Sequence, residues 1–314
     1  MSDKILIIDS IHPSFKKIVE EKGFVCEDGT AWNKEEIILK INNYTGVVIR
    51  SRFKLDKDFL AHTDNLKFIA RAGAGMENID VHYATSKRIA CLNSPEGNRD
   101  AVGEHAIGML LSLFNNLNKA GTEVRKGIWL REENRGVELQ GKTVGIIGFG
   151  NMGSAFAKKL SGFEVNIIAY DKYIAIDSIK FPFVQQVSME KIFEETDIIS
   201  FHIPLTDETK YLVDDDFINR FKKNIYIINT SRGPILNTAD LVKNLKTGKV
   251  KGACLDVLEY ESTSFENFSA NDIPELIQYL MNSDKVVLTP HIAGWTFESN
   301  DKMAKILAKK VLEL

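Results

Sequence analysis

The chain is poor in cysteine, with only Cys26, Cys91 and Cys254 spread over 314 residues. It contains no C-x-x-C pair, which argues against both a zinc site and a disulfide framework. We therefore expect buried thiols and no bound metal. No apolar run approaches the roughly 18 residues that cross a membrane. Asp3 and Lys4 lead directly into an apolar strand, a pattern unlike that of a signal peptide, so we expect a cytoplasmic protein.

The chain also lacks a strong charge of either sign. Its net charge of −3 provides no basic footprint for nucleic acid or for an anionic membrane, and we expect neither partner. The apolar fraction of 44% and the charged fraction of 26% are those of an ordinary globular protein. A length of 314 residues favours two domains.

The most informative segment is a glycine motif between an apolar strand and a helix. Residues 143–147 predict a buried parallel strand, residues 154–160 predict a helix, and G-x-G-x-x-G stands between them. Gly148 permits the tight turn, and Gly150 lets the backbone approach a pyrophosphate. Gly153 lets the helix pack closely on the strand, and the helix N-terminus faces the phosphate charge. The pattern predicts a dinucleotide site.

An acidic residue follows the motif at the spacing that a dinucleotide site requires. Asp171 ends a second apolar strand, residues 165–170, about 20 residues beyond the glycines. A carboxylate at this place can accept both ribose hydroxyls of NAD, and it would repel the 2′-phosphate of NADP. The sequence therefore favours NAD, although Lys172 next to it weakens the preference slightly.

Strands and helices alternate along the chain, which predicts parallel sheets covered on both faces. Expected strands lie at 5–9, 47–50, 68–70, 89–92, 198–203, 225–229, 252–256 and 286–288, besides those named above. Expected helices lie at 14–22, 34–42, 57–61, 81–86, 99–115 and 296–312. The segment from 262 to 282 is expected to be irregular at first and then helical over 274–281.

This order of elements predicts an α/β protein with two doubly wound parallel-sheet domains, Rossmann-like or flavodoxin-like, and a cleft between them. Residues 94–98 interrupt the pattern and predict a domain boundary. The last helix lies beyond the final strand, and its simplest place is on the first domain. We therefore predict a discontinuous substrate-binding domain, 1–97 plus 296–314, and a dinucleotide-binding domain, 98–295. Two chain crossings suit a hinge that closes on substrate.

Three segments at predicted strand ends carry side chains capable of chemistry. Arg232 can grip a carboxylate with two hydrogen bonds, although it can equally be a surface arginine that caps a turn. Asp256, Glu259 and Glu261 form a charged turn in which Asp256 could contact a nicotinamide, while at least one carboxylate serves only the turn. A lone histidine is usually structural, but His291 at a strand end is a good acid–base candidate.

Taken in order, these segments resemble the D-isomer-specific 2-hydroxyacid dehydrogenases, and within them the phosphoglycerate dehydrogenase branch. The resemblance covers nearly the whole chain, and its motifs are specific in combination. They are residues 148–153, 171, 202–206, 229–233, 252–257 and 289–294, with 50–52, 71–75, 78–80 and 93–98 in the first domain.

The resemblance implies an enzyme that interconverts a small D-2-hydroxy acid and its 2-oxo acid by hydride transfer with NAD. Arg232 would bind the substrate carboxylate. His291 would take or donate the hydroxyl proton, and Glu261 would pair with His291 and stabilise the imidazolium. A homodimer built on the NAD-binding domains and the helix at 99–115 is also implied.

The resemblance further implies two sets of contacts. The cofactor would contact Gly148, Gly150, Asn151, Met152, Gly153, Asp171, His202, Pro204, Thr230, Ser231, Asp256, Ala293 and Gly294. The substrate would contact Arg50, the backbone around Ala72, Gly73, Ala74 and Gly75, and Asn78.

The sequence leaves several substrates as alternatives. Arg50, Arg52 and Arg71 near the expected pocket could hold a phosphate, which favours 3-phosphoglycerate and a role in serine biosynthesis. Glycerate, hydroxypyruvate, glyoxylate and lactate are alternatives, because these arginines could serve the carboxylate or the surface. Formate is disfavoured, because formate dehydrogenases replace the glutamate at the position of Glu261 with glutamine. An NAD-sensing, corepressor-like binding protein of the same fold is the alternative from another class.

Two departures from the family pattern concern the region after the catalytic glutamate and the end of the chain. Ser262 stands where the family usually has proline, and the segment up to Lys285 is longer than usual. The loop that positions Glu261 is therefore expected to have a different shape. The sequence ends at Leu314 without the regulatory extension of longer phosphoglycerate dehydrogenases, so we expect no feedback by serine.

Overall fold

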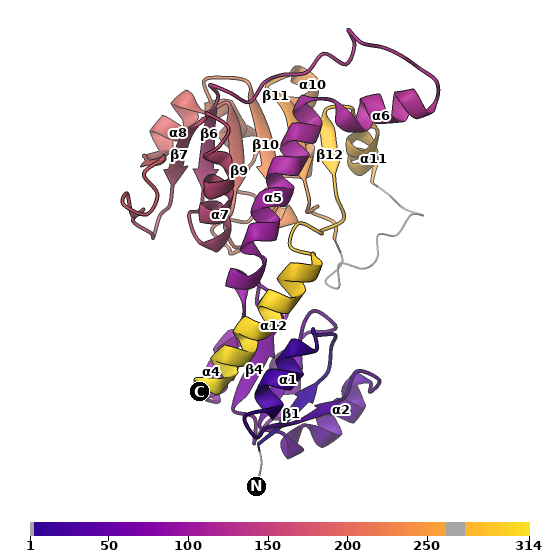
Figure 1. Ribbon diagram of the computed structural model, residues 1–314, viewed down its shortest axis with the longest axis vertical. Coiled ribbons are helices and arrows are strands. Elements are labelled where there is room, and N and C mark those ends of the chain that lie inside the picture. Colours follow the sequence, from indigo (N-terminus) through magenta and orange to yellow (C-terminus); the bar gives the residue numbers. More distant parts are fainter. Residues whose placement is uncertain (1–2, 262–273) are drawn as a thin grey trace. The chain divides into compact units, whose positions relative to one another are not determined.

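The computed structural model describes residues 3–261 and 274–314, which form two compact units. The first unit contains residues 3–98 and Trp295–Leu314, and the second contains Arg99–Glu261 and residues 274–294. Each is a parallel sheet with helices on both faces (Figure 1). Residues 94–98, predicted to interrupt the pattern and to mark a domain boundary, lie at the end of the first stretch of unit 1, and helix α5 (Pro95–Phe114) begins within them. Proline is well suited to the first turn of a helix, where its missing N–H costs nothing.

The first unit has a five-stranded sheet of the order β2-β1-β3-β4-β5. The order reverses between β1 and β3, so the carboxyl ends of these two strands flank the switch point where ligands bind in such sheets. The strands are β1 (Lys4–Ile7), β2 (Val25–Asp28), β3 (Gly46–Ile49), β4 (Phe68–Arg71) and β5 (Ala90–Leu92). The edge strand β2 was not predicted, since Cys26 is its one buried residue and it has no apolar run.

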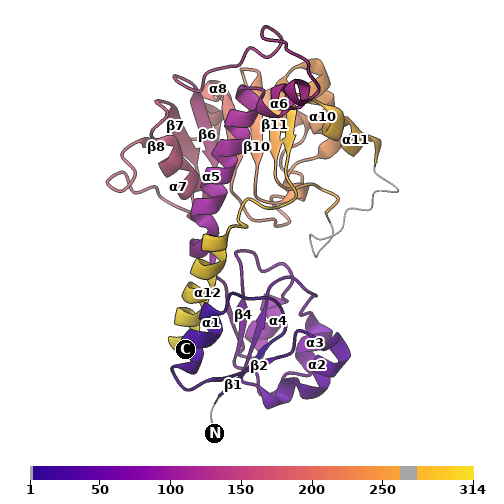
Figure 2. The same ribbon diagram turned by 45° about the vertical axis from the view of Figure 1, so that its right-hand side comes forward.

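Helices cover both faces of this sheet (Figure 2). Successive strand residues face opposite sides, so Ile5 and Ile7 pack with α1 (Ser14–Glu20) and α12 (Phe297–Leu312). Leu6 and Ile8 pack on the other face. The helical elements on that face are α2 (Lys34–Lys40), η1 (Ile41–Asn43), α3 (Lys57–Ala61) and α4 (Val81–Ser86).

The second unit has a seven-stranded sheet of the order β12-β11-β10-β9-β6-β7-β8. Its switch point lies between β6 and β9, the arrangement of a Rossmann fold. The strands are β6 (Thr143–Ile147), β7 (Asn166–Tyr170), β8 (Val184–Gln186), β9 (Ile198–Phe201), β10 (Ile225–Asn229), β11 (Val250–Leu255) and β12 (Val286–Leu288). The short edge strand β8 was not predicted.

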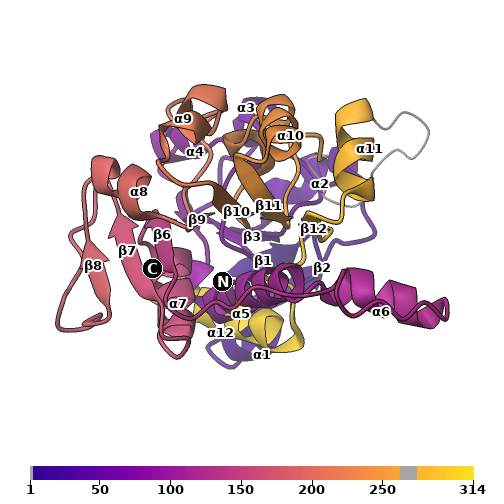
Figure 3. The ribbon, with the colours of Figure 1, turned by 90° about the horizontal axis from the view of Figure 1, so that it is seen from above.

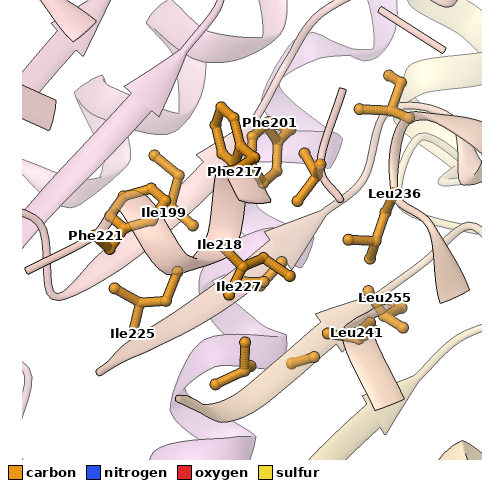
Figure 4. Close-up of a cluster of buried hydrophobic side chains, with 14 of the residues drawn as sticks. Ile199, Phe201, Phe217, Ile218, Phe221, Ile225, Ile227, Leu236, Leu241 and Leu255 are labelled. Carbon is orange, nitrogen blue, oxygen red and sulfur yellow. The ribbon is translucent and has the colours of Figure 1, made fainter. Parts of the chain in front are cut away.

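The helices of the second unit lie in two layers (Figure 3). Helix α5 and helix α7 (Asn151–Leu160) cover one face of the sheet. The other face carries α8 (Met189–Glu195), α9 (Asp215–Arg220), α10 (Thr238–Thr247) and α11 (Glu275–Asn282). Their side chains form a continuous apolar core with the strands, in which Phe217 of α9 lies beside Phe201 of β9 (Figure 4). Residues buried on both faces explain why the central strands read as apolar runs.

One further helix, α6 (Leu117–Arg125), has no buried residue among its nine. With the loop that follows it, α6 exposes Leu117, Val124 and Trp129. Helix α11 agrees with the predicted helix at 274–281, whereas residues 262–273, predicted to be irregular, lie outside the described part of the chain. Across the described ranges, no helix is both long and apolar enough to span a membrane.

Candidate active site

The predicted site residues of the second unit follow the carboxyl ends of its strands. Because parallel strands end at one common edge, the loops after β6, β7, β9, β10, β11 and β12 lie along the same side of the sheet. These loops hold the glycine motif, Asp171, His202, Arg232, Glu261 and His291. Residues that are far apart in sequence therefore share one edge.

The three motif glycines differ in the space around their Cβ positions. Gly148 has a φ of +89°, and a Cβ there would lie 2.5 Å from the carbonyl oxygen of His202. A Cβ on Gly153 would lie 2.0 Å from the carbonyl oxygen of Gly148. At Gly150, in contrast, no described atom apart from those of its chain neighbours lies within 4 Å of the Cβ position. Two glycines thus permit close packing, while Gly150 leaves open space against its backbone.

Helix α7 begins at Asn151, three residues earlier than predicted. Its N-cap is Gly150, and among the described residues no side chain caps this end of the helix. The first backbone amides of a helix have no partner within the helix, and they attract anions. The uncapped end and the open space at Gly150 fit the pyrophosphate of a dinucleotide.

The Asp171 carboxylate organises the loops on either side of it. Its Oδ2 atom accepts a hydrogen bond of 2.7 Å from the amide of Phe149 in the glycine loop. Its Oδ1 atom accepts bonds of 2.8 Å from the amides of Tyr173 and Ile174. A carboxylate has about four acceptor positions, so capacity for a ribose hydroxyl remains on Oδ2.

Lys172 is engaged by its neighbours. It forms an ion pair with Glu208, which also accepts a hydrogen bond of 3.0 Å from the hydroxyl of Tyr173. The hydrogen bond with Glu208 raises the pKa of Lys172, and the same bond lowers the pKa of Glu208. The charge that was expected to weaken the preference for NAD is therefore offset by a nearby carboxylate.

His202 supports the glycine loop from β9. Its Nε2 atom lies 2.8 Å from Ser200 Oγ, and its ring packs against Phe156 with a centroid distance of 5.2 Å. Burial lowers the pKa of His202 to about 3, so the ring is neutral at pH 7. Its carbonyl oxygen borders Gly148, so the residue shapes the cofactor loop. Pro204, two residues on, is exposed, and its carbonyl accepts a hydrogen bond of 2.6 Å from Thr209.

The loop after β10 is held by a buried asparagine. Asn229 Oδ1 accepts hydrogen bonds from the amide and hydroxyl of Ser231, and its Nδ2 donates to the carbonyl of Arg232. Arg232 is half-buried, and its Nη1 donates to the Ser231 carbonyl at 2.6 Å. A Cβ on Gly233 would lie 2.0 Å from the Leu258 carbonyl oxygen, so this glycine brings the loop against the one that carries Glu261.

Thr230, in the same loop, is a further candidate for the cofactor. Its hydroxyl is buried and has no hydrogen-bond partner within the described residues. Buried hydroxyls are normally hydrogen-bonded, so an orphan at the edge of the sheet fits a bound polar ligand.

The catalytic candidates of this edge form a pair. His291 Nδ1 lies 2.8 Å from Glu261 Oε2, and the two side chains are 23% and 19% exposed. The other oxygen of Glu261 accepts a hydrogen bond from the amide of Leu258. His291 has a φ of +55°, and its amide donates to the carbonyl of Asp256 at 2.8 Å. Backbone strain of this kind concentrates at functional sites.

Asp256 builds the loop on which His291 stands. It is only 1% exposed, and its Oδ1 accepts hydrogen bonds from the Thr289 hydroxyl at 2.6 Å and the Ile292 amide at 2.8 Å. Its Oδ2 accepts from the Ala293 amide at 2.8 Å. The residue predicted to contact a nicotinamide thus has a positioning role, and the predicted site residue Ala293 is tied to it. Gly294, the next residue, ends the second unit.

Two further residues, Thr289 and His105, belong to this network. Thr289 donates to Asp256, and His105 Nε2 of helix α5 lies 3.0 Å from the hydroxyl of Thr289. A residue 184 positions away in sequence gives no local signal of this contact. Glu259, in contrast, has a structural role outside the turn, since it accepts hydrogen bonds from the Tyr211 hydroxyl and the Thr238 amide.

In the first unit, the predicted substrate residues follow β3 and β4. Asp9 Oδ2 accepts hydrogen bonds of 3.0, 2.8 and 2.9 Å from the amides of Arg50, Ser51 and Arg52. The buried side chain of Asn78 donates to the Arg50 carbonyl at 3.4 Å. Asn78 therefore positions the loop that carries Arg50.

The two other arginines considered for a phosphate differ from Arg50. The guanidinium of Arg52 donates to the carbonyls of Ile8 at 3.0 Å and Trp32 at 2.7 Å, so Arg52 is a structural residue. Arg71 lies against Gly73, where a Cβ would be 1.6 Å from its Nη1.

The amides of residues 72–75, predicted to bind the substrate carboxylate, are partly used within the fold. Those of Ala72 and Gly73 donate to the Ile49 and Arg71 carbonyls at 2.8 and 2.9 Å. The amides of Ala74 and Gly75 are left as the candidates. In the described part of the chain, no three His, Cys, Asp or Glu side chains gather as metal ligands.

Comparison with known proteins agrees with this geometry. Residues 107–293 match the family model described as the NAD-binding domain of D-isomer specific 2-hydroxyacid dehydrogenases. The chain is 33% identical to D-3-phosphoglycerate dehydrogenase of Archaeoglobus fulgidus over 99% of its own length and 57% of that protein. It is 36% identical to hydroxypyruvate reductase of Thermotoga maritima, over 89% of this chain and 88% of that one. The chain thus spans about half the length of the phosphoglycerate dehydrogenases it matches.

Solved structures are similar as well. A D-lactate dehydrogenase from Aquifex aeolicus, solved with NAD and lactic acid, superposes with a TM-score of 0.82 at 26% identity. The match covers 98% of this chain and 94% of that one.

Proposed function

The chain belongs to the family of D-isomer specific 2-hydroxyacid dehydrogenases, and from this premise we propose that it interconverts a small D-2-hydroxy acid and its 2-oxo acid. Its cofactor is NAD, because residues 107–293 are the NAD-binding domain of that family. The observation that carries the proposal is the His291–Glu261 pair, held at 2.8 Å on the same sheet edge as the glycine loop.

The residues at this edge fit NAD. The uncapped start of helix α7 and the open space at Gly150 suit the pyrophosphate, and Asp171 suits a ribose hydroxyl. The orphan hydroxyl of Thr230 suits a polar group of the nicotinamide half. When bound, NAD would supply the redox chemistry, as the acceptor or donor of a hydride, which is two electrons and one proton, at carbon 2 of the acid.

The chain's own residues transfer the proton and bind the substrate. His291 takes the proton of the 2-hydroxyl during oxidation and returns it during reduction. With Glu261 ionised, the carboxylate accepts from Nδ1 of His291 and orients the imidazole, so that Nε2 is the atom that exchanges the substrate proton. Arg232 binds the substrate carboxylate. In the first unit, Arg50, Asn78 and the amides at 74–75 are the candidates for substrate binding.

The first candidate substrate is 3-phosphoglycerate, which would place the protein in serine biosynthesis. It is supported by the 33% identity to a phosphoglycerate dehydrogenase over 99% of the chain. An unphosphorylated acid, such as hydroxypyruvate, glyoxylate or lactate, is the second candidate. It is favoured by the engagement of Arg52 with main-chain carbonyls, which removes one of three arginines considered for the phosphate.

The test is the oxidation of NADH by the purified protein with phosphohydroxypyruvate, hydroxypyruvate, glyoxylate, pyruvate and 2-oxoglutarate. A preference for phosphohydroxypyruvate supports the first candidate, and a preference for another acid supports the second. Inactivity across the panel with intact NADH binding contradicts the dehydrogenase and supports a corepressor-like NAD sensor.

We also propose that the protein is a homodimer built on its NAD-binding units. The apolar residues that α6 and the following loop expose, Leu117, Val124 and Trp129, support this, because a partner would bury them. A cytoplasmic location stays a prediction from the sequence.

A further inference from the structure

Arg50 lies beside the switch point of the sheet in the first unit. It is the first residue after β3, whose carboxyl end borders the switch point between β1 and β3. In doubly wound sheets, ligands bind in the crevice at this point. A half-buried guanidinium there is suited to a negatively charged oxygen.

The main chain of Arg50 is fixed from two sides. The amides of Arg50 and its two successors converge on one carboxylate oxygen of Asp9, at 2.8 to 3.0 Å. The Asn78 side chain donates to the Arg50 carbonyl. These hydrogen bonds fix the backbone from which the side chain of Arg50 extends.

The side chain of Arg50 is held by an aromatic ring. Its Cζ lies 4.4 Å from the ring centroid of Trp295, a residue of the same unit that is 50% exposed. Arg52 is held in another way, because its guanidinium donates to main-chain carbonyls. Arg52 is therefore tied to main-chain carbonyls, and the guanidinium of Arg50 lies over a half-exposed indole.

We infer that Trp295 is a positioning residue, which holds the Arg50 guanidinium flat so that Arg50 binds an oxyanion of the substrate. A ring stacked on a guanidinium covers its face, whereas its N–H donors lie in its plane and pair with two oxygens at once. The oxyanion belongs to a carboxylate or a phosphate. Its identity as part of a 2-hydroxy or 2-oxo acid rests on the proposed function.

The first experiment is steady-state kinetics of the full chain with NADH and each acid of the panel. Trp295→Leu removes the ring and should raise KM for the acid about threefold to thirtyfold, the range of cation–π contacts from exposed to desolvated sites. KM for NADH should stay unchanged. Trp295→Phe keeps an aromatic face and should restore most of the loss. An effect confined to phosphohydroxypyruvate assigns the phosphate, and an effect on all acids assigns the carboxylate.

A matched control exists in the same unit. Lys40 Nζ lies 4.0 Å from the ring centroid of Trp32, so Trp32→Leu also removes an indole from beneath a cation. It should leave KM for every acid unchanged. If Trp32→Leu and Trp295→Leu raise KM equally, the effect is one of general stability, and the inference is overturned.

A double-mutant cycle tests whether Trp295 acts through Arg50. In an Arg50→Gln background, Trp295→Leu should have little further effect on KM, because the group that the ring positions is already lost. Independent effects that multiply would contradict a positioning role.

A binding measurement separates this inference from the proposed function. With Trp32→Phe and Trp129→Phe, Trp295 is the one tryptophan left of three, and its fluorescence reports on the stack. Titration with oxalate or inorganic phosphate, without cofactor, should change the emission, and Arg50→Gln should abolish the change. If the panel is inactive but this response is present, the proposed function falls and the inference stands. If the panel is active but the response is absent or survives Arg50→Gln, the inference falls.

Discussion

His291 shows how a single residue is prepared for proton transfer. Its ring is held by Glu261, and its amide is held by the Asp256 carbonyl. We expect His291→Asn to lower kcat by roughly 10²- to 10⁴-fold, the usual contribution of a general acid–base, with the Kd for NADH little changed. Glu261→Gln should cost less, because it keeps an acceptor for Nδ1. Near-normal turnover of His291→Asn would exclude the assignment.

Asp171 carries the choice between the two dinucleotides. Asp171→Asn keeps a side-chain oxygen but removes the charge that binds a ribose hydroxyl and repels a 2′-phosphate. We expect the ratio of kcat/KM for NAD over NADP to fall about tenfold to a hundredfold, the worth of one hydrogen bond to a charged group.

Asp177 offers a matched control for this substitution. It accepts hydrogen bonds from the amides of Ile179 and Lys180, as Asp171 does from those of Tyr173 and Ile174. Asp177→Asn should leave the NAD/NADP ratio unchanged. If the ratio also stays constant in Asp171→Asn, another group sets the preference.

In the turn from β6 into α7, substitution of one glycine should affect NADH binding and substitution of another should affect stability, because the glycines have different surroundings. Gly150→Ala places a methyl group where no described atom apart from those of its chain neighbours lies within 4 Å, so the thermal midpoint should change little while NADH binding is lost or strongly weakened. Gly153→Ala brings a Cβ to 2.0 Å from the Gly148 carbonyl oxygen, so the midpoint should fall.

Gly108 in helix α5 is the control for both substitutions. It is exposed, and apart from its chain neighbours and the backbone of its own helix, no described atom lies within 4 Å of its Cβ position. Gly108→Ala should stabilise the helix by up to about 1 kcal/mol and leave NADH binding intact. Tight NADH binding by Gly150→Ala would contradict a pyrophosphate site at this turn.

The end of strand β9 makes the second unit sensitive to acid. Burial lowers the pKa of His202 from 6.5 to about 3. Between these two pH values, the His202 ring is therefore protonated in the unfolded chain but stays neutral in the folded chain. The contribution of the neutral His202 ring to the free energy of unfolding is fully present above pH 6.5. It is lost as the pH falls toward 3, by about 1.4 kcal/mol per pH unit. In urea unfolding between pH 7 and pH 4, His202→Gln should show a shallower loss of stability. An identical slope would contradict a buried neutral histidine.

At the scale of the whole molecule, the exposed apolar side chains of α6 and its loop predict self-association. Val124 and Trp129 are 51% and 76% exposed. Val124→Glu combined with Trp129→Glu should convert a dimer into a monomer, as measured by analytical ultracentrifugation. Ile179→Glu is the control, because Ile179 is 92% exposed on a different loop of the same unit. A wild-type chain that is monomeric at assay concentration would contradict the dimer.

Several elements could be predicted from local patterns. The bounds of β6, β10 and β12 and those of α3 and α4 agree with the predicted ranges, because short apolar runs flanked by breakers leave few alternatives. The edge strands β2 and β8 were missed, since Glu27 and Asp28 in β2 and Gln185 and Gln186 in β8 interrupt the apolar run, whereas the edge strand β12 is apolar throughout. Helices α6, α8, α9 and α10 were also missed, and α8 and α9 span only seven and six residues.

The positions of the site residues could also be predicted, but their hydrogen bonds could not. Glu261 and His291 were predicted as a pair and lie 2.8 Å apart. In contrast, no pattern in the sequence indicated that Arg52 donates to a main-chain carbonyl or that Asp256 accepts hydrogen bonds from the loop of His291. Each partner in these bonds comes from a distant part of the chain.

By itself, the sequence determined the family, the cofactor class and the succession of strands and helices, because glycine spacing and apolar periodicity are local properties. Only the tertiary structure decided which polar groups are already engaged. Arg52 meets a carbonyl 44 residues away, and His105 meets Thr289 across 184 residues. Such bonds depend on which strand ends the sheet order places side by side. Trp295, which no motif singled out, received its proposed role from its position over Arg50 alone.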